Sequence, residues 1–70
     1  MKAYVFPNSN VAVFDDKGKQ VPELQGPLIV MHAEKAEELG YDPTSIEYEM
    51  GSYRWRCFRT SEGRLNFESI

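Results

Sequence analysis

Cysteine and histidine are almost absent from this sequence, because Cys57 and His32 are the only residues of their kinds. A single cysteine excludes a disulfide within the chain, and structural zinc needs about four Cys or His ligands. We therefore expect neither a disulfide framework nor a metal site. Small secreted domains usually carry several disulfides, so the lone cysteine predicts a reducing compartment and a cytoplasmic protein.

Long apolar runs are also lacking. The longest is Leu28–Met31, which is too short for the apolar part of a secretory leader or for a membrane-spanning helix. The chain contains no glycine-rich phosphate loop and no nucleophile motif. We expect no membrane segment, no cofactor and no catalytic site, and hence a protein that is not an enzyme.

Apolar and aromatic residues are well represented. Hydrophobic residues make up 41% of the 70 positions, and four Tyr, four Phe and one Trp are too many for a disordered segment. A chain of this size buries only about 60% of the surface that its unfolded form exposes. We expect one small domain over residues 1–70. Its net charge of −3 disfavours non-specific binding to nucleic acid.

The first half of the chain predicts two strands and a helix. Lys2–Phe6 and Val11–Phe14 are strand candidates separated by turn formers. Asp15–Lys19 predicts a bulged turn with Gly18 in the left-handed conformation, which sets Val13 opposite Val21. A helix is predicted from Pro27 to Leu39, or from near Met31, with Gly40 just past its end. Its expected apolar stripe comprises Leu28, Met31 or His32, Ala36 and Leu39.

The last third predicts a three-stranded meander. Gly51-Ser52 fits a two-residue hairpin that pairs Met50 with Tyr53, Tyr48 with Trp55, and Ile46 with Cys57. These six side chains are expected on one face, packed on the helix. Glu49 then lies opposite Arg54, and Glu47 opposite Arg56, on the other face. A second turn at Ser61-Glu62-Gly63 pairs Arg59 with Leu65 and Cys57 with Phe67. The prediction is an α+β fold in the order ββαβββ, with an N-terminal hairpin, the meander, and one helix on one face of the sheet.

Aromatic and basic residues alternate over Tyr53–Arg59. Base stacking with phosphate contacts would give a nucleic-acid platform, but alternation along a strand puts the aromatics and arginines on opposite faces. Core aromatics with a salt-bridged outer face are the structural alternative. Phe58 falls on the outer face, among arginines, in a composition typical of binding hot spots. We therefore predict a partner-binding site comprising Phe58, Arg54, Arg56 and Arg64, unless a bulge or the N-terminal strands bury Phe58.

His32 and Cys57 are interpreted as structural residues. His32 lies beside apolar helix positions, and a general base would also need a cleft and a nucleophile. Cys57 is predicted on the apolar face of a strand, where a thiol behaves as a small hydrophobic group with a raised pKa. Glu34, Glu37, Glu38 and Asp42 form an acidic surface, interpreted as a solvated helix face, although such carboxylates can also bind a divalent ion or imitate phosphates.

The segments Met1–Asn8 and Gly18–Gln25 resemble small uncharacterised proteins encoded by phages and prophages. The resemblance implies an accessory protein that binds or inhibits a host or phage macromolecule. Together with the residue patterns, it predicts a non-enzymatic module that binds a protein partner or itself. The alternative is a small nucleic-acid-binding domain that uses Arg54, Arg56, Arg59 and Arg64.

Overall fold

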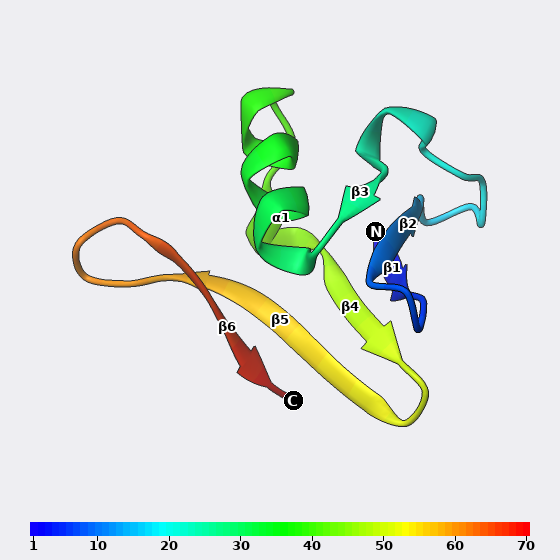
Figure 1. The fold of residues 1–70 in the computed structure, drawn as a ribbon. Helices are drawn as coiled ribbons and strands as arrows, with labels where there is room; N and C mark the ends of the chain where they lie inside the picture. Colours follow the sequence, from blue (N-terminus) through cyan, green and yellow to red (C-terminus); the bar gives the residue numbers. More distant parts are fainter.

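A computed structural model describes all 70 residues and shows an α+β fold in which a six-stranded sheet curls around one helix (Figure 1). The strand order is β3-β2-β1-β4-β5-β6, and every pair is antiparallel except β1 with β4. The elements are β1 (Lys2–Val5), β2 (Asn10–Phe14), β3 (Gly26–Pro27), α1 (Ile29–Glu38), β4 (Glu47–Met50), β5 (Tyr53–Arg59) and β6 (Leu65–Ser69), with 3-10 turns at Pro22–Leu24 and Pro43–Ser45.

The N-terminal strands differ in detail from the prediction. β1 and β2 form an antiparallel hairpin, and Gly18 has the predicted left-handed conformation, with φ of 78°. The amide of Val21 donates to the carbonyl of Val13 at 2.8 Å, as the predicted pairing requires. Only an isolated bridge between Phe14 and Gln20 follows this turn, because Pro22 begins a 3-10 turn. The edge is instead closed by β3, a two-residue strand that was not predicted, so the order is βββαβββ.

The predicted meander is confirmed in β4, β5 and β6. Gly51 has a φ of 60° in the first hairpin and Gly63 a φ of 83° in the second, so both turns use the left-handed conformation that glycine permits. Met50 pairs with Tyr53, and Cys57 pairs with Phe67, in the expected registers. Ile46 is not paired with Cys57 as predicted, because it ends the Pro43–Ser45 turn and β4 begins one residue later. The parallel pairing of β1 with β4 joins the two strand sets.

The helix is shorter than predicted, and the face that it turns to the sheet matches the prediction only in part. It begins at Ile29 because Pro27 belongs to β3 and Leu28 has a positive φ. The buried helix residues are His32, Ala33 and Ala36. The small alanine side chains allow the helix to approach the sheet closely. Of the predicted stripe, His32 and Ala36 are buried as expected, but Leu28, Met31 and Leu39 are exposed. No helix of the protein has the length and apolar character needed to cross a membrane.

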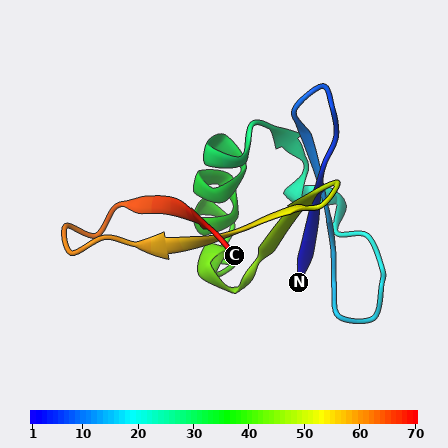
Figure 2. The same ribbon diagram turned by 90° about the horizontal axis from the view of Figure 1, so that it is seen from below.

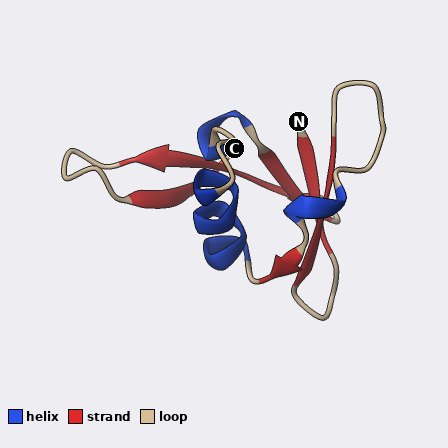
Figure 3. Ribbon diagram, turned by 90° about the horizontal axis from the view of Figure 1, so that it is seen from above, coloured by secondary structure: helices blue, strands red, loops and turns tan.

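The core lies between α1 and the middle of the sheet. It contains nine buried apolar side chains: Ala3, Val11, Val13, Leu24, Ala33, Ala36, Ile46, Tyr48 and Cys57. Figure 3 shows α1 between the two wings of the curled sheet, with the N-terminal strands on one side and the C-terminal hairpin on the other. The fold therefore concentrates its burial at the centre and leaves both wings partly uncovered.

His32 is a buried structural residue hydrogen-bonded on both ring nitrogens. Its Nε2 lies 2.9 Å from the carbonyl oxygen of Leu24, and its Nδ1 lies 2.9 Å from the hydroxyl of Tyr48. A carbonyl oxygen only accepts, so Nε2 carries the proton and Nδ1 accepts from Tyr48. Burial lowers the pKa of His32 and raises that of Tyr48. A proton on Nδ1 would reverse this bond, with Tyr48 as the acceptor, and would place a positive charge in the core, where burial disfavours it.

The free energy of unfolding should fall as the pH falls below about 6.5, the ordinary pKa of histidine. The folded protein keeps His32 neutral, so below this pH the unfolded state binds a proton that the folded state does not. The slope is at most about 1.4 kcal/mol per pH unit. Urea unfolding between pH 5 and 8 measures this slope. The range lies above the usual pKa values of carboxylates.

The matched control is His32→Gln, since an amide can also donate to the Leu24 carbonyl and accept from Tyr48. This variant should show a flat pH profile over the same range. An equal slope in both proteins would contradict the assignment to His32.

Candidate functional site

Three of the four predicted site residues lie together on the outer face of the sheet, the face turned away from α1. Arg54, Arg56 and Phe58 alternate with core-facing residues along β5. Phe58 is half-buried rather than exposed. Arg64 lies outside β5, in the hairpin that leads to β6. Arg54 lies near the start of β5, whereas Arg64 follows its end. The structure therefore does not bring all four residues into one cluster.

The outer face carries alternating charges across four strands. Lys2 on β1 pairs with Glu49 on β4 at 3.3 Å, Arg54 on β5 pairs with Glu47 on β4 at 3.2 Å, and Arg56 pairs with Glu68 on β6 at 3.6 Å. The predicted strand register is correct, but Glu49 bonds to Lys2 instead of Arg54. This hydrogen bond also raises the pKa of Lys2. The sequence could not show this pairing because it depends on β1 lying beside β4.

Every arginine of the protein has a carboxylate partner. Besides the pairs of Arg54 and Arg56, Arg59 lies 3.0 Å from Glu37 on α1, and Arg64 lies 3.8 Å from Glu62. A phosphate-binding surface needs basic groups that are available to the phosphate. Here each guanidinium is already matched, so the outer face of β5 has no excess of positive charge.

A second surface lies on the helix side of the sheet, where the β4–β5 hairpin extends past the start of α1. The predicted six-residue apolar face is buried only in part: Tyr48, Cys57 and Ile46 are in the core, but Met50 is 39% and Tyr53 is 66% exposed. The uncovered part forms a groove of about 220 Å³, which we call the hairpin groove, lined by Val5, Ser9, Leu28, Ile29, Met50 and Trp55. Figure 2 shows the β4–β5 hairpin continuing past the helix.

Two residues of the hairpin groove have a strained backbone. Ser9 has a φ of 71° and Leu28 a φ of 57°, and they are the only non-glycine residues with positive φ. The amide of Leu28 donates to the carbonyl of Ser9 at 2.8 Å, so a backbone hydrogen bond connects the two strained positions. Such conformations cost on the order of 1–3 kcal/mol each and gather at binding sites. Neither residue is a glycine, so this geometry could not be predicted from the residue types.

The acidic helix surface does not form a compact site. Glu37 pairs with Arg59, and Asp42 accepts hydrogen bonds from the amide and hydroxyl of Thr44 at 3.0 and 2.6 Å. These bonds to Thr44 lower the pKa of Asp42. No three His, Cys, Asp or Glu side chains come together in a way that could hold a metal ion.

Cys57 should react with thiol reagents only after the protein opens. The side chain is 1% exposed in the core, and burial raises the pKa of its thiol. We expect native protein to be labelled by a disulfide reagent at a rate that follows the opening equilibrium and rises with added urea. A Cys57→Ser, Ser69→Cys variant, with its thiol at an exposed position, should react at once. Equal rates in the two proteins would show that Cys57 is accessible.

Comparison with known proteins finds no matching family model, no matching curated protein and no matching solved structure. The function is therefore argued from the geometry of the two surfaces described above.

Proposed function

We propose that the protein is a non-enzymatic binding module that recognises a protein partner through the hairpin groove. The observation that supports this most is the uncovered apolar surface formed by Met50, Tyr53 and Trp55, beyond the N-terminal end of α1. Aromatic residues and methionine are enriched in protein interfaces. The groove volume of about 220 Å³ is below the roughly 300–1,000 Å³ of small-molecule pockets, so it suits one or two apolar side chains of a partner.

The groove is built to be rigid. The ring of Tyr53 stacks on that of Trp55, with centroids 6.2 Å apart and planes 18° from parallel. On the opposite wall, Leu28 is fixed by its backbone bond to Ser9 and its carbonyl accepts from the amide of His32 in the core. A surface that is already ordered loses less conformational entropy on binding. The strained backbone at Leu28 also holds its side chain outward, where a partner can bury it.

The predicted outer site of Phe58, Arg54, Arg56 and Arg64 stays a prediction. Phe58 is half-buried and the arginines are paired, so it offers less unsatisfied surface than the groove. The same pairing, with the net charge of −3, weakens the nucleic-acid alternative. A phage-type accessory protein acting in the cytoplasm is consistent with the small size and the free thiol of Cys57.

Affinity capture of the tagged protein from host lysate, with and without nuclease, tests the proposal when three chains are compared. The double variant Met50→Lys, Tyr53→Lys places one charge in the groove and another beside it, where Tyr53 stacks on Trp55, and should lose a captured stoichiometric protein. Phe58→Glu changes the outer face and should keep it. Thermal unfolding of each variant verifies that the fold is retained.

The opposite pattern, with capture lost only in Phe58→Glu, would move the site to the outer face of β5. Material that disappears on nuclease treatment would support the nucleic-acid alternative instead. Sedimentation of the purified protein reports self-association, which the groove variant should abolish if the partner is a second copy.

A further inference from the structure

A pocket on the outer face of the N-terminal strands is distinct from both surfaces discussed above. It measures about 490 Å³, within the range of small-molecule sites, and Ala12 lies in its lining. Phe6 and Phe14 provide aromatic walls, and Asn10, Gln20 and Gln25 contribute carboxamides. None of its lining residues is charged.

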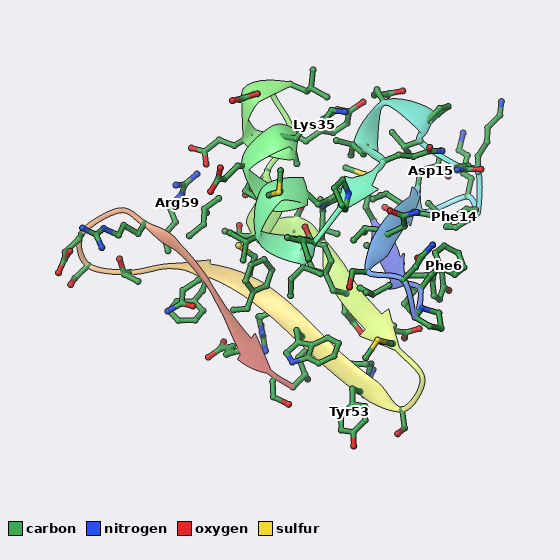
Figure 4. The ribbon with its side chains drawn as sticks, in the orientation of Figure 1. Phe6, Phe14, Asp15, Lys35, Tyr53 and Arg59 are labelled. Carbon is green, nitrogen blue, oxygen red and sulfur yellow. The ribbon has the colours of Figure 1, made fainter.

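The shape of the pocket follows from strand geometry. Asn10, Ala12 and Phe14 alternate along β2, so all three point to the outer face. The methyl group of Ala12 is much smaller than its neighbours, which leaves a hollow between them. Figure 4 shows Phe6 and Phe14 on the same side of β1 and β2. Tyr4 holds Phe14 in place by an edge contact, with ring centroids 5.7 Å apart and an interplanar angle of 69°.

The polar groups of this pocket have free hydrogen-bonding capacity. The side-chain amides of Asn10, Gln20 and Gln25 make no hydrogen bond within the protein. Asn8 uses its Oδ1 to accept from the amide of Asn10 at 3.1 Å, which leaves its NH₂ free. Each free carboxamide offers two donors and an acceptor. Aromatic walls with unpaired carboxamides and no charge are therefore available to a ligand.

We infer that this pocket binds a neutral saccharide unit. Sugar hydroxyls both donate and accept, as carboxamides do, and the C–H face of a pyranose ring packs on an aromatic side chain. Phosphate-bearing ligands are disfavoured, since the lining of this pocket contains no cation. The site is separate from the hairpin groove, so it does not depend on the proposed partner binding.

Nuclear magnetic resonance titration of ¹⁵N-labelled protein tests this inference. The probes are cellotriose, maltotriose and tri-N-acetylchitotriose, with adenosine and uridine as neutral planar ligands for comparison. At least one saccharide should shift the side-chain NH₂ signals of Asn10, Gln20 and Gln25 with millimolar affinity. Gln25→Ala, an exposed substitution, should weaken that affinity about fivefold, as loss of one hydrogen bond implies.

Ala12→Leu fills the hollow on the solvent side of the sheet and should abolish the shifts, whereas Ser69→Leu adds the same side chain on β6 and should not. The groove variant Met50→Lys, Tyr53→Lys should bind saccharide like the original protein. Shifts with the nucleosides alone, no shifts with any saccharide, or unchanged binding in Ala12→Leu would each overturn the inference.

Discussion

The single short helix sets the limits of this structure. A helix of ten residues is about 15 Å long, whereas six strands about 4.8 Å apart form a sheet roughly 24 Å wide. The helix therefore covers only the centre of one face, and it does so through His32, Ala33 and Ala36. The buried bond between His32 and Tyr48 fixes the helix over β4. Everything beyond its reach, on either wing and on the whole outer face, has to be stable in contact with water.

The outer face meets this requirement with charge pairs on one half and with aromatic and amide groups on the other. Lys2, Glu49, Glu47 and Arg54 neutralise one another across the strands. Exposed pairs of this kind contribute about 0–1 kcal/mol each, so they make the surface soluble and specific more than they stabilise it. The N-terminal strands have no such network around Ala12, and there the surface keeps unpaired amides beside two phenylalanines.

Most of the correct predictions from the sequence came from local patterns of turn residues and strand alternation. The meander followed from Gly51 and Gly63, because a two-residue or bulged turn fixes the register of the strands on both sides of it. The parallel pairing of β1 with β4 could not be predicted, since nothing in either strand specifies a partner that is distant in sequence. For the same reason the Lys2–Glu49 pair could not be predicted, whereas the salt-bridged outer face of β4 and β5 followed from the hairpin register.

The candidate sites were less accessible for a similar reason. Arg54, Arg56 and Phe58 fall on the face that alternation predicts. The exposure of Met50 and Tyr53 depends on where the helix begins, which the positive φ of Leu28 determines. The hollow around Ala12 needs Gln20 and Gln25 to lie beside β2, which follows from the short β3 edge and its preceding turns.

The parallel contact between β1 and β4 also has a consequence for how the chain folds during synthesis. β1 and β2 are neighbours along the chain, but the other edge of β1 has no partner until Glu47–Met50 has left the ribosome. Long-range pairing of this kind is slow because a large loop must close before any contact forms. Ala3 and Val13, which are fully buried in the finished protein, stay in contact with solvent during that interval. The nascent N-terminal hairpin is then an unpaired edge on which a chaperone, or a neighbouring nascent chain, can act before the protein's own β4 arrives.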